Sequence, residues 1–286
     1  MKLTRRHFLQ LSTGAIAGGV LARGFYEPHK TVTVRREIRL ARLPEAMDGL
    51  RVVQLSDLHF NPYQTREHLA RIVSLANAEH PDLVLLTGDF ITAGFRQSER
   101  IPRAEHAWPC AEALRGLDAR LGTFAVLGNH DCHSNAQVVS EALNSTGKIK
   151  VLRNRAIPLE RDGARVWLAG VDNVTARLAD ADKTLRGIPA QECTLAAVHE
   201  PDYADVLRQH PVDMQFSGHS HGGQIVFPVV GPLYLPRLAR KYPFGYYRLG
   251  NLQLYTNRGI GMIGVPIRFL CPPEMTVFTL RTAKGA

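Results

Sequence analysis

The chain has 286 residues, of which 45% are hydrophobic and 21% charged, and its formal net charge is +9. This length and apolar content are sufficient for a substantial core and suit one large α/β domain better than two small domains. The steady alternation of apolar and polar segments, without repeats or low-complexity tracts, excludes a disordered, fibrous or solenoid protein.

The first 24 residues differ in composition from the rest of the chain. Lys2, Arg5 and Arg6 precede an uncharged apolar stretch that runs from Phe8 to Ala22. This arrangement is typical of an export signal, and the stretch is shorter than the about 20 apolar residues that span a bilayer. The run Thr4-Arg5-Arg6-His7-Phe8-Leu9 resembles the twin-arginine signal of proteins that are exported in the folded state. A basic amphipathic helix docked on the domain is the alternative interpretation.

The N-terminal segment predicts an exported protein, periplasmic or attached to the outer face of the inner membrane, with the twin-arginine translocase as a partner. No Ala-x-Ala cleavage site follows the apolar stretch, which leaves open whether the segment is removed or retained as an anchor. Four of the nine excess positive charges belong to residues 1–24, so the remainder is mildly basic, at about +5. This balance favours an anionic substrate or surface and does not indicate nucleic acid.

Residues 25–45 are predicted to form a polar connector and an edge strand, because residues 31–40 alternate between apolar and polar side chains. From residue 46 to residue 282, short apolar runs are separated by segments of helical periodicity. Near-continuous apolar runs indicate strands that are covered on both faces. We expect such strands at residues 52–55, 83–86, 124–127, 166–169, 195–198 and 214–216.

Helices are predicted between these strands. Leu69, Ile72, Val73 and Ala76 share one face of a helix expected at about residues 65–79. Further helices are expected at residues 104–115, at residues 135–143 with Ser134 as the N-cap, and at residues 203–208. Strands and helices therefore alternate, which predicts a layered α/β fold. The chain after Gly222 is rich in Gly and Pro and is expected to add strands and loops that close the sheet.

Polar side chains follow five of the apolar runs directly. They are Asp57 with His59, Asp89, Asn129 with His130 and Asp131, His199, and His219 with His221. Each group by itself is explained better by a turn or by a hydrogen-bonded core residue. The carboxyl ends of strands in α/β sheets form the crevice where ligands bind, so the five groups together would converge on one site. Imidazoles and carboxylates are the usual ligands of Zn, Mn and Fe, and paired ions lie about 3.5–4 Å apart.

Taken in order, the motifs resemble those of the calcineurin-like metallophosphoesterases: Asp57-x-His59, Gly88-Asp89, Gly128-Asn129-His130-Asp131, His199 and Gly218-His219-Ser220-His221. The resemblance covers residues 50–224 and implies a single domain with a four-layer α/β/β/α sandwich. The longer run from Gly218 to Gln224, together with Gly259, Gly261 and Pro266, is similar to a branch of exported or membrane-associated bacterial phosphodiesterases. Some members of that branch hydrolyse the pyrophosphate of UDP-2,3-diacylglucosamine.

The resemblance also implies two divalent metal ions, Mn, Zn or Fe. One ion is expected on Asp57, His59, Asp89 and His221, and the other on Asp89, Asn129, His199 and His219. A hydroxide that bridges the ions would attack phosphorus, because coordination lowers the pKa of water from 15.7 toward about 7. The role implied for His130 is to contact the phosphate or protonate the leaving oxygen, oriented by a hydrogen bond with Asp131.

The expected activity is that of a phosphodiesterase or pyrophosphatase acting on an envelope-associated phosphate ester, acylated or nucleotide-linked. One alternative is UDP-2,3-diacylglucosamine pyrophosphatase of lipid A synthesis, which uses a cytoplasmic substrate and so fits an exported protein poorly. A second alternative is a phosphatase that acts on a soluble nucleotide or phosphomonoester. A metal-stabilised binding protein without turnover is less consistent with a full set of ligands beside His130.

Several further residues are weaker candidates. His133, Asp172 and Arg237 could lie on the substrate side of the site, although a surface residue, a turn former and a solvated loop are the more common explanations. Glu200 could orient a metal ligand.

The apolar run at residues 225–234, followed by Arg237, Arg240 and Lys241, suits an acylated phosphate or a membrane surface as well as it suits a buried strand. The cysteines Cys110, Cys132, Cys193 and Cys271 lack zinc-ribbon spacing, and the sequence leaves their disulfide state open.

Overall fold

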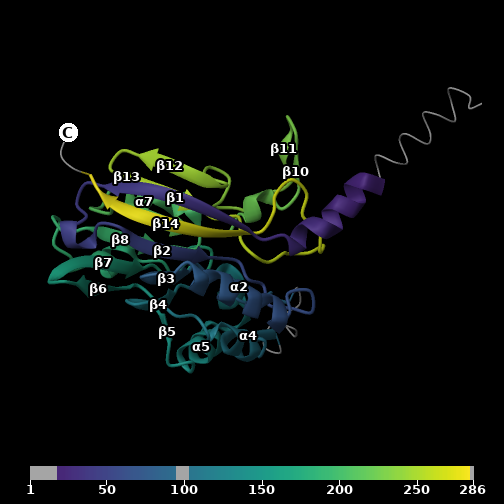
Figure 1. Ribbon diagram of the computed structural model, residues 1–286, viewed down its shortest axis with the longest axis horizontal. Helices are drawn as coiled ribbons and strands as arrows, with labels where there is room; N and C mark the ends of the chain where they lie inside the picture. Colours follow the sequence, from purple (N-terminus) through teal and green to yellow (C-terminus); the bar gives the residue numbers. More distant parts are fainter. Residues whose placement is uncertain (1–17, 95–102, 284–286) are drawn as a thin grey trace, which may run out of the picture.

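Two six-stranded sheets form the centre of the computed structural model, which describes residues 18–94 and 103–283 (Figure 1). The first sheet has the order β1-β14-β2-β3-β4-β5, in which β2 to β5 run parallel to one another and β14 runs antiparallel to β2. Its strands are β1 (Val32–Leu40), β14 (Glu274–Thr282), β2 (Leu50–Leu55), β3 (Leu83–Leu86), β4 (Gly122–Ala125) and β5 (Ile149–Val151).

The second sheet has the order β12-β13-β9-β8-β7-β6. The central strands β13, β9, β8 and β7 run parallel, whereas β12 and β6 pair antiparallel at the two edges. Its strands are β12 (Gly245–Leu249), β13 (Leu252–Thr256), β9 (Met214–Ser217), β8 (Thr194–Ala197), β7 (Ala164–Gly170) and β6 (Arg155–Arg161).

Helices cover the outer face of each sheet. The first sheet is covered by α2 (Arg66–Ala78), α4 (Ala107–Leu114) and α5 (Asn129–Asn144), and the second by the short helices α6 (Ala181–Leu185) and α7 (Ala204–Leu207). Figure 1 shows α2, α4 and α5 together on one side of the molecule. The result is an α/β/β/α sandwich in a single domain, which confirms the expected fold class.

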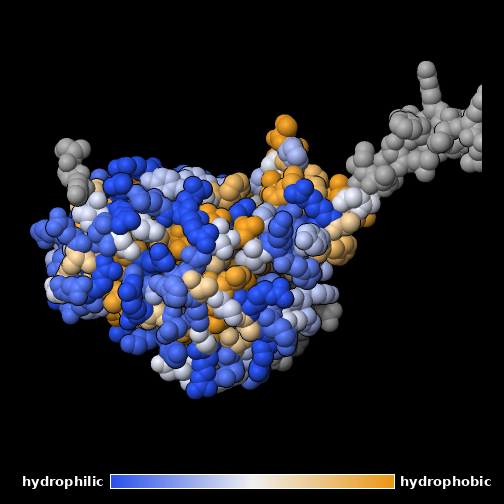
Figure 2. All heavy atoms as spheres, viewed as in Figure 1, coloured by the Kyte–Doolittle hydropathy of each residue, from blue (hydrophilic) through white to orange (hydrophobic). Residues whose placement is uncertain are grey.

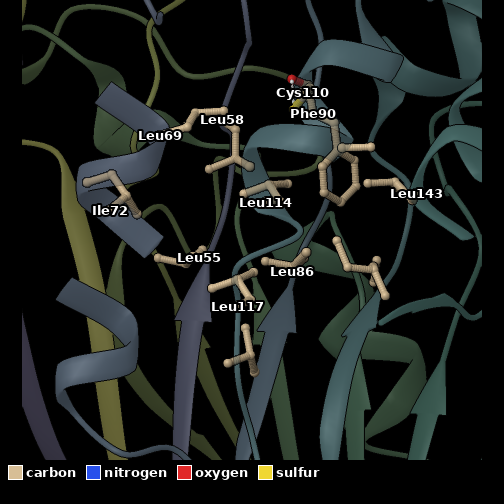
Figure 3. Packing of buried hydrophobic residues seen from close by; sticks show 14 of the residues in the cluster. Leu55, Leu58, Leu69, Ile72, Leu86, Phe90, Cys110, Leu114, Leu117 and Leu143 are labelled. Carbon is tan, nitrogen blue, oxygen red and sulfur yellow. Dashed lines mark hydrogen bonds between the residues drawn. The ribbon is translucent and has the colours of Figure 1, made fainter. Parts of the chain in front are cut away.

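The alternation of side chains along each strand explains why the strands of the first sheet read as continuous apolar runs. In β3, Val84 and Leu86 face the helices, and Leu83 and Leu85 face the second sheet. The helix-side cluster joins Leu86 with Leu69 of α2 and with other buried side chains that Figure 3 shows. Both faces of these strands are therefore shielded from solvent, and only the strand ends are available for polar chemistry.

Two local predictions are confirmed. The edge strand expected at residues 31–40 is β1 (Val32–Leu40), which pairs in parallel with β14. The helix expected at residues 65–79 is α2, where the Thr65 side chain accepts a hydrogen bond from His68 N and so acts as the N-cap.

The predicted start of α5 is wrong. This helix begins at Asn129, directly after the Gly128 N-cap, and Ser134 lies inside it. The interruption is at Asn135 (φ −169°, ψ 100°), whose side-chain oxygen accepts hydrogen bonds from Gln137 N and Val138 N. Asn135 therefore caps the second part of the helix, and the first part carries Asn129 and His130 into the site.

No sequence pattern predicted β5, β6 or α6. β5 and β6 have mixed burial, and α6 has only five residues, with Asp180 as its N-cap. The region after Gly222 forms β10 (Val226–Phe227), β11 (Gly231–Pro232), β12, β13 and β14 with intervening loops, as expected.

The N-terminal part of the described chain is a helix at residues 18–26 followed by η1 (Glu27–His29). The predicted export signal at residues 1–24 lies mostly outside the described residues. Within residues 18–94 and 103–283, no helix has both the length and the apolar character needed to span a membrane. All four cysteines are described, and each is a free thiol.

Candidate metal centre

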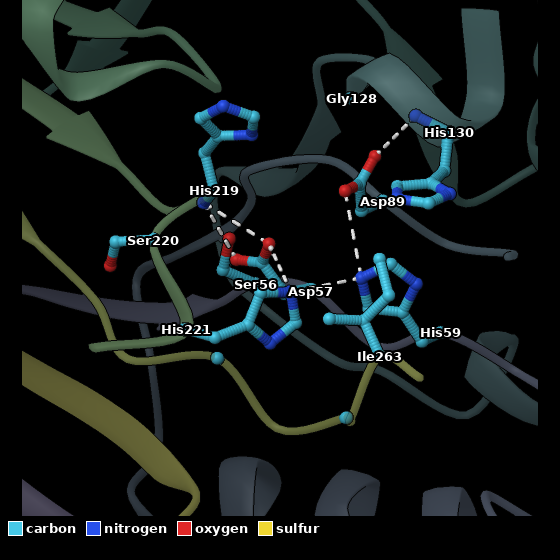
Figure 4. Close-up of polar contacts among 12 residues, drawn as sticks. Ser56, Asp57, His59, Asp89, Gly128, His130, His219, Ser220, His221 and Ile263 are labelled. Carbon is cyan, nitrogen blue, oxygen red and sulfur yellow. Dashed lines mark hydrogen bonds and ion pairs between the residues drawn. The ribbon is translucent and has the colours of Figure 1, made fainter. Parts of the chain in front are cut away.

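The carboxyl ends of five strands, three from the first sheet and two from the second, meet at one edge of the sandwich. Asp57 and His59 follow β2, Asp89 follows β3, Asn129 follows β4, His199 follows β8, and His219 and His221 follow β9. Figure 4 shows His59, Asp89, His219 and His221 gathered around Asp57. The convergence expected from the positions of these residues at strand ends is thus present in the folded chain.

One group of ligand atoms comes from Asp57, His59, Asp89 and His221, all buried and all within 4.8 Å of one another. His59 Nε2 lies 3.1 Å from His221 Nε2 and 3.5 Å from Asp89 Oδ2. His221 Nε2 lies 3.4 Å from Asp57 Oδ1. A contact between His59 Nδ1 and Thr92 Oγ1 at 3.1 Å holds the opposite side of the His59 ring, so Nε2 faces inward.

A second group comes from Asp89, His199 and His219. His199 Nε2 lies 3.3 Å from Asp89 Oδ2, 3.1 Å from His219 Nδ1 and 3.2 Å from the side-chain oxygen of Asn129. Asp89 belongs to both groups and joins them.

Main-chain carbonyls hold the other nitrogens of these two imidazoles. His199 Nδ1 donates to Thr87 O at 2.7 Å, and His219 Nε2 donates to Arg237 O at 2.8 Å. Because a carbonyl can only accept, each neutral ring carries its proton on the outer nitrogen. The lone pairs of His199 Nε2 and His219 Nδ1 are thereby turned into the site, as metal ligation requires.

The backbone is strained at five residues of these groups. Asp57, His59, Asp89, His219 and His221 have φ angles of 51°, 46°, 55°, 69° and 52°. Left-handed conformations of non-glycine residues cost about 1–3 kcal/mol each and persist where the surroundings enforce them, often at functional sites. The concentration of strain at these residues is consistent with a site that the fold stabilises at some cost.

Two glycines allow the strand ends to approach closely enough. A Cβ on Gly128 would lie 2.1 Å from Asp89 Oδ1, and one on Gly218 would lie 1.8 Å from Ser56 Oγ and 2.2 Å from Asp57 Oδ2. No side chain fits at either position, so the two carboxylates depend on glycine as their neighbour.

Burial and charge set the protonation of the site. Burial lowers the pKa of His59 and of His221 well below the ordinary range, which favours their neutral, ligand-competent forms. Burial also opposes the charged form of His199, but the Asp89 carboxylate outweighs it and raises the pKa of His199 well above its ordinary value. Neutral imidazoles beside anionic carboxylates make a donor set that suits Zn, Mn or Fe, and a cation there would displace the proton that Asp89 favours on His199.

His130 lies beside these groups, with its ring 4.9 Å from that of His59. Its backbone N–H donates to Asp89 Oδ1 at 2.8 Å. Its ring Nδ1 accepts a hydrogen bond from Ala93 N at 3.0 Å, so the neutral ring carries its proton on Nε2.

The expectation that Asp131 orients the His130 ring is wrong. The Asp131 carboxylate is fully buried and accepts hydrogen bonds from three backbone groups, Phe90 N, Ile91 N and Gly128 N. Burial, with the Asp89 carboxylate nearby, raises the pKa of Asp131 to about 8. Asp131 therefore fixes the loop after β3 against the start of α5. The His130 ring is oriented by Ala93 N instead of by Asp131.

A cavity of about 400 Å³ opens onto the site. Asp89, His130 and His221 contribute to its polar part. Its apolar part is lined by Ile225, Leu233, Tyr234, Ile263 and Val265. The run at residues 225–234 thus borders the cavity instead of forming a buried strand.

The weaker candidates lie elsewhere. His133 is exposed on α5 and is not among the residues that line this cavity, and neither is Asp172. The Asp172 carboxylate is buried and pairs with Arg153 Nε at 2.8 Å. Arg237 contributes its carbonyl to His219, and its side chain does not line the cavity. The Glu200 carboxylate accepts from Asn173 Nδ2, Val174 N and Thr175 N, so it supports a loop and not a ligand.

Residues 50–223 match the family model of the calcineurin-like phosphoesterases. The matched region contains all seven of the predicted ligands. The chain belongs to this family. It is therefore a metallophosphoesterase, a hydrolase that acts on phosphate esters.

Curated bacterial relatives align with nearly the whole chain. The phosphoesterase is 35% identical to the metallophosphoesterase YkuE of Bacillus subtilis, over 98% of this chain and 99% of that protein. It is 29% identical to phosphodiesterase YaeI of Escherichia coli, over 97% of this chain and 99% of that protein. A zebrafish (Danio rerio) transmembrane protein with a metallophosphoesterase domain is 34% identical over 90% of this chain and 58% of its own length.

Among solved structures, the phosphoesterase is similar to the protein TT1561 of Thermus thermophilus, with a TM-score of 0.47 and 12% identity over 73% of this chain and 89% of that chain.

No residue pattern indicated the groups that orient the imidazoles of the site. Thr92 Oγ1, Ala93 N and the Thr87 carbonyl each hold one imidazole. Two of these are main-chain groups, which carry no residue-type signal. Arg268 was also missed: it is fully buried, and its guanidinium donates to the carbonyls of Gly259 and Gly261, the segment that packs against Asp57.

Proposed function

We propose that this phosphoesterase is a phosphodiesterase or pyrophosphatase that uses two divalent metal ions to hydrolyse an envelope-associated phosphate ester. The observation that carries the proposal is the pair of ligand groups that share Asp89 beside a cavity with one apolar wall. The name of the similar protein YaeI, a phosphodiesterase, supports a diester as the substrate.

In this proposal one ion is held by Asp57, His59, Asp89 and His221. The other is held by Asp89, Asn129, His199 and His219. The donor atoms fit divalent ions of the Zn, Mn or Fe type, because every donor is a carboxylate, an amide oxygen or an imidazole nitrogen. The ring contacts with Thr92, with Thr87 O and with Arg237 O fix three of the imidazoles before any ion arrives.

When bound, the ions would supply positive charge to the phosphoryl oxygens and lower the pKa of a coordinated water. The chain's own polar contribution to the reaction is His130. Ala93 N–H occupies Nδ1, so the Nε2–H of the neutral ring can donate a hydrogen bond to a phosphoryl oxygen or to the leaving oxygen. A ring held by a backbone amide keeps this orientation without a carboxylate partner.

The wall formed by Ile225, Leu233, Tyr234 and Val265 supports a substrate with an apolar part next to its phosphate. An acylated phosphodiester would place its phosphate at the polar part of the cavity and its acyl chain against the apolar wall. UDP-2,3-diacylglucosamine has the same two-sided character and is the alternative substrate. A soluble nucleotide or phosphomonoester would leave the apolar wall without a partner.

The test is a comparison of substrates on the metal-loaded full chain. We expect faster turnover of bis(p-nitrophenyl) phosphate than of p-nitrophenyl phosphate, and faster turnover of a short-chain acylated diester than of its deacylated form. Hydrolysis of monoesters only would contradict the diesterase proposal. Equal rates with and without the acyl chain would contradict the role of the apolar wall.

We also propose that residues 1–24 direct the folded phosphoesterase to the twin-arginine translocase, and that it acts outside the inner membrane. The Arg5-Arg6 pair before an uncharged stretch supports this assignment. Replacing both arginines by lysine is expected to leave the protein in the cytoplasmic fraction. Unchanged export of that variant would contradict the assignment.

A further inference from the structure

An exposed aliphatic turn projects from the body of the molecule next to the metal centre. β10 (Val226–Phe227) and β11 (Gly231–Pro232) pair antiparallel, and the turn between them carries Val229 and Val230. These side chains have relative exposures of 107% and 78%. Figure 1 shows the hairpin at the same end of the molecule as the helix of residues 18–26. Val229 contributes no buried area to the fold, and Val230 contributes little.

The backbone conformation of the turn makes valine an unusual residue at position 229. Val229 has φ +70°, a left-handed conformation that β-branched residues disfavour and that Gly, Asn and Asp adopt readily. An apolar residue that is both strained and fully exposed is unfavourable for folding and for solubility. Folding therefore does not explain the residue, whereas contact with an apolar partner does.

The helix of residues 18–26 presents a second apolar surface nearby. Leu21, Phe25 and Tyr26 are exposed on it. Figure 2 shows hydrophobic residues gathered on the hairpin and beside the base of this helix. We call the five exposed side chains the apolar rim: Leu21, Phe25, Tyr26, Val229 and Val230.

The exposed charges at the apolar rim are positive, and one of them, Arg23, forms an ion pair with the buried Glu27 at 3.1 Å. Residues 225–234 contain no charged side chain, and the one acid in residues 18–30, Glu27, is buried. Arg23 and Lys30 are exposed beside the rim. Exposed apolar side chains next to cations and without exposed acids complement an anionic lipid surface.

The two parts of the rim are held together by one segment. The Phe269 ring lies 5.8 Å from the Phe227 ring of the hairpin, and Arg23 of the helix stacks over Phe269 at 5.8 Å. Backbone bonds join the same parts: Val226 N donates to Phe269 O at 2.9 Å, and Arg268 N donates to Gly24 O at 3.0 Å. The hairpin and the helix therefore keep a fixed relation and can meet one surface together.

We infer that the apolar rim docks the phosphoesterase on the surface of an anionic lipid bilayer. The valine turn and the exposed side chains of the helix enter the boundary between headgroups and acyl chains, and Arg23 and Lys30 remain among the headgroups. The uncharged stretch from Phe8 to Ala22 leads directly into this helix, so the same end of the chain carries a further segment that favours lipid. A bilayer fits both parts of the rim.

Docking by the rim also orients the cavity toward the lipid surface. Leu233 and Tyr234, at the base of the hairpin, line the cavity that opens onto the metal centre. A docked rim brings the mouth of this cavity to the lipid surface, where a phosphate ester anchored by an acyl chain is presented. This last step rests on the proposed function, but the docking surface itself does not.

The first test measures binding of the full chain to vesicles made of equal parts phosphatidylcholine and phosphatidylglycerol. The double variant Val229→Asp/Val230→Asp is expected to bind at least about tenfold more weakly than the wild type, because two aliphatic side chains no longer enter the bilayer. Asp tolerates a positive φ, so this variant keeps the turn. The matched control is Leu178→Asp/Val206→Asp, at two positions that are each 41% exposed and outside the rim; it is expected to bind like the wild type.

The second test locates the turn directly. In Val230→Trp, vesicles with brominated acyl chains are expected to quench the added tryptophan fluorescence, above the background from Trp108 and Trp167. In Leu178→Trp, they are expected to leave it unchanged. This measurement does not depend on the apolar stretch at residues 8–22, which is the same in both variants.

Equal vesicle binding by the wild type and the valine double variant would overturn the inference, as would equal quenching in the two tryptophan variants. A wild-type dimer that the double variant dissociates, with vesicle binding unchanged, would assign the rim to self-association instead. Turnover of soluble bis(p-nitrophenyl) phosphate is expected to be the same in the double variant and the wild type. That assay therefore reports on the proposed function, and vesicle binding reports on the rim.

Discussion

Replacing Gly128 by Ala tests whether close backbone approach holds the bridging carboxylate in place. The added Cβ would lie 2.1 Å from Asp89 Oδ1 and 2.4 Å from Asp89 N. To restore even a 3.0 Å contact the carboxylate must retreat by about 0.9 Å, whereas metal–ligand distances tolerate only about 0.2 Å. The backbone of Gly128 itself (φ −90°, ψ 178°) suits alanine, so the effect comes from the contact alone.

We expect Gly128→Ala to lose stability by about 2 kcal/mol, as overpacking of a tight site does, and to bind metal at least about tenfold more weakly. Metal content by plasma mass spectrometry, thermal melting and turnover of a chromogenic diester measure these effects. Gly116→Ala is the matched control, because its new methyl would meet only Val73 Cγ1, at 3.2 Å. Wild-type metal content and turnover in Gly128→Ala would refute the reasoning.

Further predictions concern the roles of single residues and of the metal. Asp89→Asn is expected to abolish metal binding at both ligand groups, because Asp89 belongs to both; retention of two ions would refute the bridge. His130→Ala is expected to keep its metal and lose about 100-fold or more in turnover, and full turnover would exclude His130 from the reaction. Asp172→Asn is expected to cost about 1 kcal/mol of stability through the lost Arg153 pair, at unchanged kcat and KM; a raised KM would restore Asp172 to the substrate side. Removal of metal by a chelator is expected to abolish turnover and to lower the melting temperature. The stabilisation lost is about 3 kcal/mol if the free metal concentration was about 100 times Kd before chelation. An unchanged melting curve would show that the ions do not stabilise the fold.

The sequence was sufficient to predict the layers and the position of the site. Apolar runs such as residues 83–86 identify buried strands because both faces of those strands are covered. Asp57, Asp89 and His199 stand out because a polar side chain directly after such a run has few roles other than a turn or a ligand. The periodicity of α2 and the cap at Thr65 are likewise local features, readable within one segment.

The errors arose where a contact joins segments that are distant in the chain. Asp131 follows His130 in sequence, and adjacency suggested that the carboxylate orients the ring. The fold instead turns Asp131 toward Phe90 N and Ile91 N, and Ala93 N reaches the His130 ring. Asp172 was a weaker candidate for the substrate side because it follows an apolar run, but its carboxylate pairs with Arg153 instead.

Sequence by itself determined which chemistry the site can perform, because coordination chemistry restricts the residue types and strand periodicity restricts their positions. Only the tertiary structure decided which nitrogen of each imidazole faces inward. That choice depends on partners such as Thr87 O, which is 112 residues from His199 and offers a main-chain group common to every residue type. The exposure of Val229 and Val230 was decided in the same way, since the run at residues 225–234 is equally apolar whether a fold buries it or projects it. The residue types thus specify the ligand atoms, and packing between distant segments specifies which way each ligand atom points.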